Sequence, residues 1–157
     1  YQGHEINLSL PWPRISCKEA FERYGQINLD EFLDIKNARK ICLKHGYQVS
    51  EKNTWEELYH QIFLNEIEPE LIKLPVVFLY DYPAPLAALS RIKKDNSRYA
   101  ERFEFYLAGL EIGNGYSELT GWKEQEKRLK NDLKERRKKG MKTFAFSSMG
   151  LPGLPEK

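Results

Sequence analysis

The alternating stretch from residue 101 to residue 119, ERFEFYLAGLEIGNGYSEL, constrains the fold of this chain more than any other segment. Phe103 and Phe105 alternate with Glu104 and Tyr106, which is typical of a β-strand that has one buried face. An Ala-Gly pair at 108–109 favours a turn, and the residues after it have the composition of a returning strand. The segment therefore predicts a β-hairpin.

Four polar side chains of this hairpin have no obvious role in folding: Glu104, Glu111, Asn114 and Glu118. A tight turn would bring Glu104 and Glu111 near each other, and like charges across a strand pair destabilise a sheet unless a cation neutralises them. Magnesium suits such a pair, because it binds through a couple of carboxylates and keeps water or phosphate oxygens in its other positions. The Gly-Asn-Gly sequence at 113–115 is expected to break the strand. We therefore predict a ligand site on the hairpin.

A simpler interpretation is equally compatible with the spacing alone. Charged side chains often keep an exposed edge strand soluble. In that case the glutamates would face water and bind nothing. The residues by themselves leave both interpretations open.

The rest of the chain predicts an α+β fold in which helices flank an antiparallel sheet. Residues 75–80, PVVFLY, form a nearly continuous apolar run that favours a central strand buried on both faces. The following Asp-Tyr-Pro-Ala-Pro at 81–85 predicts a rigid loop. A short strand is expected at residues 4–8, before a Pro-Trp-Pro corner.

Capping boxes predict where two helices begin. Ser16 is followed by a glutamate three residues later, and so is Thr54. Residues 29–72 are expected to be helical in pieces, with one helix over 29–45 and a second that begins at Thr54. Pro69 is expected either to break the second helix or to begin the turn after it.

Residues 120–140 are expected to hold a heavily charged helix, and residues 141–157 a loose tail rich in Gly, Pro and Ser. The net charge of +2 gives no global field that would favour nucleic acid. The chain has only two cysteines, which favours reduced thiols over a zinc site or a disulfide framework. Reduced thiols favour a cytoplasmic setting, and no apolar run reaches the length of a membrane span.

Three blocks of the sequence carry a resemblance to a known family: LPWPRISCKEAFERYGQINL, VVFLYDYPAPLAALSRI, and RFEFYLAGLEIGNGYSEL followed by KEQEKRLKND. Together they resemble the catalytic core of class II lysyl-tRNA synthetases. The first two blocks are more similar to the short paralogue family that attaches lysine to elongation factor P. The sequence lacks the arginine-bearing motifs 2 and 3 and also motif 1, so we expect an internal fragment, residues 1–157, of a class II catalytic domain with its active-site strands at 76–119.

The resemblance implies a role for each polar residue of the hairpin. Glu104 and Glu111 match the carboxylates that hold magnesium against the phosphates of ATP. Asn114 and Glu118 match the pair that receives the lysine ammonium, and a carboxylate desolvated opposite that ammonium would reject ligands without the charge. Three further residues match the wall of the amino-acid pocket: Tyr82, Ala84 and Gly113.

The acceptor of the lysyl group has competing interpretations. The first two blocks favour a lysine of elongation factor P, whereas Gly113 stands where many of those ligases carry an alanine associated with β-lysine, and so favours lysine tRNA. A remnant that binds lysine or a partner without catalysis is the third possibility. We expect the fragment alone to form little or no adenylate, and the full-length enzyme to be a homodimer.

Overall fold

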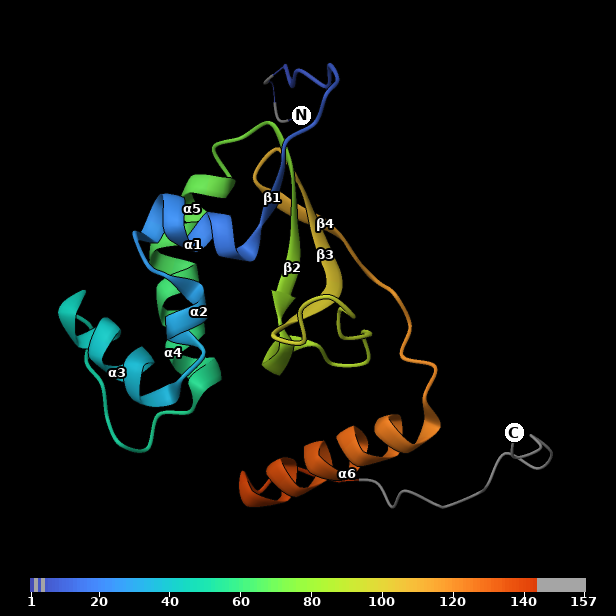
Figure 1. Ribbon diagram of the computed structural model, residues 1–157. Coiled ribbons are helices and arrows are strands. Elements are labelled where there is room, and N and C mark those ends of the chain that lie inside the picture. The colour runs from blue at the N-terminus through green and yellow to red at the C-terminus, as the bar shows by residue number, and fades with distance from the viewer. Residues whose placement is uncertain (2, 4, 144–157) are drawn as a thin grey trace. The chain divides into compact units, whose positions relative to one another are not determined.

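The computed structural model describes residue 1, residue 3 and residues 5–143 of the chain (Figure 1). It contains two compact units, Tyr1–Thr120 and Gly121–Lys157. The first unit holds the sheet and most of the helices, and the second holds one long helix. Among the described residues, no helix has the length and apolar character needed to cross a membrane.

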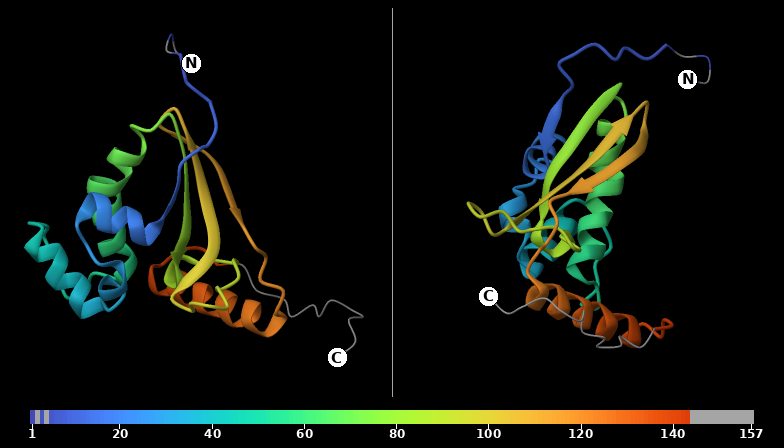
Figure 2. Two further views of the ribbon diagram at one scale, coloured as in Figure 1. Left: turned by 45° about the horizontal axis from the view of Figure 1, so that its top comes forward. Right: turned by 90° about the vertical axis from the view of Figure 1, so that its right-hand side faces the viewer.

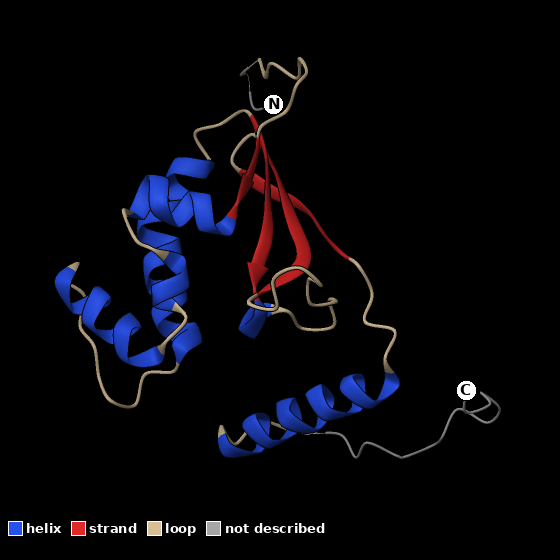
Figure 3. Cartoon of the chain, in the orientation of Figure 1, coloured by secondary structure: helices blue, strands red, loops and turns tan. Residues whose placement is uncertain are grey.

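The first unit is built around a four-stranded sheet (Figure 3). Its strands stand in the order of the chain: β1 (Arg14–Ser16), β2 (Val76–Pro83), β3 (Tyr99–Leu107) and β4 (Leu110–Tyr116). Strands β1 and β2 are parallel, and the other two pairings are antiparallel. The α+β prediction is confirmed. The strand predicted at 4–8 is wrong for its described residues, because the pairing segment comes after the prolines, where Ile15 is buried.

Helices lie to one side of the sheet, as the two further views also show (Figure 2). They are α1 (Cys17–Gly25), α2 (Leu29–Phe32), α3 (Ile35–Lys44), α4 (Trp55–Ile62), the π-helical turn η1 (Phe63–Ile67) and α5 (Glu68–Leu71). The 3₁₀ turn η2 (Ala84–Leu86) directly follows β2.

Local chemistry sets the starts of these helices. Both predicted capping boxes are present: the Glu19 amide donates to the Ser16 hydroxyl at 3.1 Å, and the Thr54 hydroxyl receives the amide of Glu57. The helix predicted over 29–45 is instead divided. Asp34 accepts hydrogen bonds from two backbone amides that follow it, and so begins a new helix.

Pro69 lies inside the first turn of α5 rather than ending a helix. Its missing amide leaves one gap in the helical hydrogen-bond ladder, and this gap lies directly after a π-helical turn, where the ladder is already irregular. The preceding π-helical turn η1 carries the chain from α4 into α5 without an intervening loop.

The core lies between the helices and one face of β2. Val77 and Leu79 on that face are fully buried. Phe21 of α1 stacks on Tyr59 of α4 with ring centroids 5.0 Å apart. On the other face of β2, Val76 is buried but Phe78 and Tyr80 are only half-buried, so the prediction that this strand is buried on both faces holds only at its first residues.

The predicted hairpin turn is confirmed. Ala108 and Gly109 both have positive φ, 50° and 78°, as in a two-residue type I′ turn. The predicted break at residues 113–115 is wrong, because β4 continues through them to Tyr116. These glycines serve packing against β3: a Cβ on Gly115 would lie 2.6 Å from the ring of Phe103.

The buried face of β3 carries Glu104 and Tyr106, which are 8% and 2% exposed, whereas Phe103 is 40% exposed. The alternation therefore predicts the strand correctly, but the aromatic set lies on the more open face. Phe78 and Phe105 stack on this open face with centroids 4.4 Å apart.

The second unit contains α6 (Trp122–Lys138), within the segment expected to form a charged helix. None of its residues is buried. Ion pairs three or four positions apart, such as Arg128 with Glu124 at 3.1 Å, line its surface. The predicted tail falls mostly on residues 144–157, which lie outside the described part of the chain.

We predict opposite effects from two substitutions in the hairpin turn. Ala108→Asn should stabilise the chain by about 0.5–1 kcal/mol, because asparagine tolerates a positive φ better than alanine. Gly109→Ala should destabilise it by about 1–2 kcal/mol for the converse reason. Urea unfolding measures both. Gly113→Ala on β4 is the control, because Gly113 has no positive φ and a Cβ there would make only an ordinary contact with Phe105.

Candidate functional site

The register of the hairpin brings two of the predicted site residues face to face. Glu104 of β3 lies directly opposite Asn114 of β4 on one side and opposite Leu79 of β2 on the other. Because residues opposite each other in a sheet share a face, all three side chains lie on the face that the helices partly cover. Glu104 is thus buried beside the core, while Asn114 is exposed near the edge of the sheet.

Both carboxylate oxygens of Glu104 have partners on its own strand. Arg102 Nη2 lies 2.9 Å from Oε1, and the Tyr106 hydroxyl donates to Oε2 at 2.8 Å. These partners precede and follow Glu104 by two residues, so the strand itself places them on the same face. A buried carboxylate is tolerated when it is paired and hydrogen-bonded in this way.

Arg102 reaches well beyond Glu104. Its Nη1 donates to the carbonyl of Leu86 in η2 at 2.9 Å, and its Nε lies 3.4 Å from Asn114 Oδ1. The guanidinium carbon also lies 4.6 Å from the ring centroid of Tyr82, a cation–π distance. One cation therefore contacts three predicted site residues, Tyr82, Glu104 and Asn114.

Tyr82 carries an unsatisfied polar group. The residue is 3% exposed. Burial raises the pKa of its hydroxyl, and the nearby Cys17 thiol and Glu104 carboxylate raise that pKa further. The Glu104 carboxylate acts both by its charge and as a nearby acceptor, but among the described residues no atom makes a hydrogen bond of ordinary geometry to this hydroxyl. An unpaired buried donor is costly, and a bound polar ligand would satisfy it.

Glu111 lies opposite Tyr106 rather than opposite Glu104. A register shift between Phe105 and Tyr106 inserts one extra residue in β4 between Glu111 and the residue that lies opposite Glu104. The two carboxylates are therefore further apart than in a regular hairpin. Their charges still interact: the pKa of Glu111 is raised, first by burial and then by the charge of Glu104, and Arg102 opposes this increase. The positive charge of Arg102 therefore does not fully compensate the two negative charges of Glu104 and Glu111.

The other predicted site residues surround this centre less closely. Gly113 pairs with Phe105, and a Cβ there would lie 3.6 Å from the Phe105 Cβ, an ordinary contact. Ala84 begins η2, and its amide donates to the Arg98 carbonyl at 2.8 Å. Glu118 is exposed and is joined to Ser90 through an isolated β-bridge, so the desolvated carboxylate that we expected is not present in this structure.

The two carboxylates fit a magnesium ion by their chemistry. Glu111 has a raised pKa that a nearby cation would reverse, and oxygen donors are what this ion prefers. Within the described residues, no cluster of three or more His, Cys, Asp or Glu side chains has a metal-binding arrangement. A magnesium ion shared with phosphate oxygens needs only one or two carboxylates.

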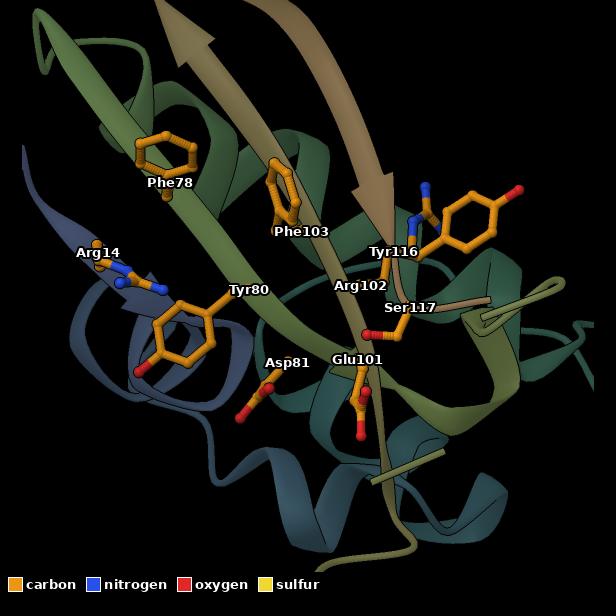
Figure 4. Close-up of a pocket in the computed structure, with 9 residues that line it drawn as sticks. All are labelled: Arg14, Phe78, Tyr80, Asp81, Glu101, Arg102, Phe103, Tyr116 and Ser117. Atoms are coloured by element: carbon orange, nitrogen blue, oxygen red, sulfur yellow. The ribbon is translucent and has the colours of Figure 1, made fainter. Parts of the chain in front are cut away.

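A cavity of about 560 Å³ lies on the open face of the sheet (Figure 4). Tyr80 and Phe103 line it from neighbouring strands, and the guanidinium carbon of Arg14 lies 5.8 Å from the Tyr80 ring centroid. Of the predicted site residues and the hydrogen-bond partners of Glu104, only Arg102 lines it as well. The cavity is therefore separate from the carboxylates of the predicted site.

Comparison with known proteins gives the family. The family model "tRNA synthetases class II (D, K and N)" matches residues 2–155. This chain belongs to that class II synthetase family. A lysine-tRNA ligase from Moorella thermoacetica is 31% identical over 136 residues, which cover 87% of this chain and 27% of the relative.

Other relatives of this class II synthetase chain have the same name. A lysine-tRNA ligase from Chloroflexus aurantiacus is 31% identical over 85% of the chain and 27% of the relative. One from Prochlorococcus marinus (strain MIT 9215) is 35% identical over 82% of the chain and 25% of the relative. The chain thus spans about a quarter of the length of these relatives, and the predicted class II fold is confirmed.

Sequence reasoning missed two residues of this candidate site, Arg102 and Tyr106. Both contact the carboxylate of Glu104. The signal was present in the sequence, because residues two positions apart in a strand share a face. The opposite charges of Arg102 and Glu104 at that spacing could have identified an ion pair, had the face of Glu104 been recognised as buried.

We predict that Arg102→Met costs about 2–3 kcal/mol of folding free energy, because it leaves Glu104 buried without its counterion. The double variant Arg102→Met, Glu104→Gln should recover at least half of that loss, since the buried charge is then removed. Urea unfolding of the four chains in this double-mutant cycle measures the coupling. Equal losses in the single and double variants would contradict the ion pair.

We also predict that Glu111→Gln raises the urea midpoint at pH 7. The raised pKa of Glu111 in the folded chain means that its protonated form favours folding. That stabilisation is complete below the ordinary value of 4.5 and is lost as pH rises through the folded-state pKa, so the ionised residue opposes folding at neutral pH.

The same substitution should therefore have a much smaller effect at pH 4 than at pH 7. Glu22→Gln is the matched control, because it makes the same change at an exposed position of α1 outside the candidate site. A pH-independent effect of Glu111→Gln would contradict the assignment.

Proposed function

We propose that the full-length parent of this chain activates lysine with ATP, releases pyrophosphate, and transfers the lysyl group to an acceptor. One observation carries the proposal: Glu104 and Asn114, which the resemblance assigns to different ligands, lie directly opposite each other in the sheet. Membership of the class II synthetase family and relatives named lysine-tRNA ligase support it.

In this proposal Glu104 and Glu111 would hold magnesium with ATP. When bound, the ion supplies charge neutralisation and orientation for the phosphates. The contribution of the chain is to hold one of these carboxylates fixed, through Arg102 and Tyr106, before any ligand arrives. Such preorganisation lowers the entropic cost of positioning the reactants.

Lysine would occupy the adjacent part of the site. Asn114 and Glu118 would receive the side-chain ammonium, while Ala84 and Gly113 would line the pocket. The buried hydroxyl of Tyr82, which has no ordinary hydrogen bond within the described residues, would donate to or accept from the ligand.

The reaction itself requires positioning rather than a nucleophilic side chain. A carboxylate oxygen of lysine forms a bond to the α-phosphorus of ATP, and the bond from that phosphorus to the bridging oxygen of the β-phosphate breaks. Lysyl-adenylate and pyrophosphate result. No residue of this chain needs to form a covalent intermediate.

Two acceptors have support. The relatives are lysine-tRNA ligases, which favours the 3′ end of lysine tRNA, as does Gly113. The sequence blocks at residues 10–29 and 76–92 favour a lysine of elongation factor P instead. Incubating the full-length enzyme with labelled lysine, ATP and each acceptor separately distinguishes the two, because label appears on only the true acceptor.

We predict that this chain binds α-lysine and that Glu118→Ala weakens the binding by about 10-fold or more, the cost of losing a charge-assisted hydrogen bond. Calorimetric titration with α-lysine and β-lysine separately measures both affinities. Glu22→Ala on α1 is the control. Equal binding by wild type and Glu118→Ala would reject the assigned lysine pocket.

Gly113→Ala extends the same titration to the choice of isomer. The added methyl group meets only an ordinary contact with Phe105, so the variant should fold. A shift of preference towards β-lysine is expected from the alanine found in the paralogue family. An unchanged preference would remove Gly113 as a determinant of specificity.

A further inference from the structure

Arg102 occupies the point where the two parts of the proposed site meet. Its guanidinium pairs with Glu104 at 2.9 Å and lies over the ring of Tyr82. The same group contacts Asn114 and the backbone of η2. Its side chain is 21% exposed, so most of it is held within the fold. In Figure 4 it lies beside Tyr116, its partner across the β3 and β4 pairing.

We propose that Arg102 is a positioning residue that serves as the internal counterion of Glu104 and couples cation binding at Glu104 and Glu111 to amino-acid binding at Tyr82 and Asn114. This inference rests on the function proposed above. Neither the metal-binding residues nor the lysine-binding residues would provide this coupling without Arg102.

The first step of the argument is competition. Arg102 and Tyr106 already occupy one oxygen each of the Glu104 carboxylate. A divalent cation that binds the same carboxylate must share it with the guanidinium, and two positive groups on one carboxylate repel each other. Binding of the cation therefore weakens the hold of Glu104 on Arg102.

The second step is linkage. Three other contacts hold the guanidinium: the Tyr82 ring and Asn114 Oδ1, which belong to the amino-acid side of the proposed site, and the Leu86 carbonyl of η2. A lysine that engages Tyr82 and Asn114 removes two of these contacts and releases Arg102 from its position beside Glu104. Lysine should therefore strengthen cation binding, and by thermodynamic reciprocity the cation should strengthen lysine binding.

The identity of the residue matters for this linkage. A guanidinium is planar and presents five donors in a fixed fork, so it can contact a carboxylate, a carbonyl, an amide oxygen and an aromatic face at once. A lysine ammonium at the same position would retain the charge but would not span these four partners. Arg102→Lys should therefore keep the counterion function and lose the coupling function.

The probe is Mn²⁺, titrated into this chain while the free ion is followed by electron paramagnetic resonance. Arg102→Gln should tighten Mn²⁺ binding about three- to tenfold, the effect of removing one positive charge roughly 7 Å from a divalent ion in water. A merely structural role would give the opposite sign, because a disordered Glu104 binds the ion less well. Arg91→Gln is the control, because it removes the same charge from a different ion pair, the one that Arg91 makes with Glu101 of β3.

Lysine tests the coupling in the same titration. α-Lysine should tighten Mn²⁺ binding in the wild-type chain and should lose this effect in Arg102→Lys. The Lys variant should keep a Mn²⁺ affinity near that of wild type, because the charge remains. It also keeps the test valid if Arg102→Gln fails to fold, which circular dichroism reports.

The outcomes separate the inference from the proposed function. Mn²⁺ binding that Glu104→Gln abolishes but Arg102→Gln leaves unchanged or weakens would overturn the inference while the proposed metal site stands. The inference would also fail if α-lysine affected wild type and Arg102→Lys equally. Absence of binding that depends on Glu104 would reject both the metal assignment and the inference.

Discussion

Burial of the Glu104 carboxylate is the constraint on which the site depends. A buried charge is stable only with a counterion and hydrogen bonds, and the strand supplies both from positions two residues before and after it. This arrangement fixes Arg102 on the same face. Through its other contacts, Arg102 then links β3 to β4 and to the turn η2.

Two irregularities in the sheet bring the site residues together. The hairpin turn aligns Tyr106 with Glu111, and a regular register from there would place Gly113 opposite Glu104 and turn Asn114 to the other face. The shift between Phe105 and Tyr106 instead places Asn114 opposite Glu104. A second shift between Tyr80 and Tyr82 leaves Tyr80 on the cavity side and Tyr82 under Arg102.

These irregularities mark the limit of what the sequence could predict. The capping residues Ser16 and Thr54 and the turn at 108–109 act through their immediate neighbours, so local composition was enough. The register shifts depend on contacts between strands, such as the close approach of Gly115 to the Phe103 ring. Hydrophobicity alone also misidentified the buried face, because the partners of Glu104 make a charged face suitable for burial.

The same physics explains how the ion pair of Glu104 is compatible with the proposed metal site. A carboxylate intended for a cation must remain ionised, yet without the cation its burial would destabilise the fold. An internal counterion resolves this conflict, because it stabilises the ionised form in the absence of ligand. Glu111 lies on the more exposed strand, and its pKa is raised by burial and by the charge of Glu104, which Arg102 opposes only in part. The two carboxylates are therefore unequal: one is fixed by its neighbours, and the other depends more strongly on a cation for compensation.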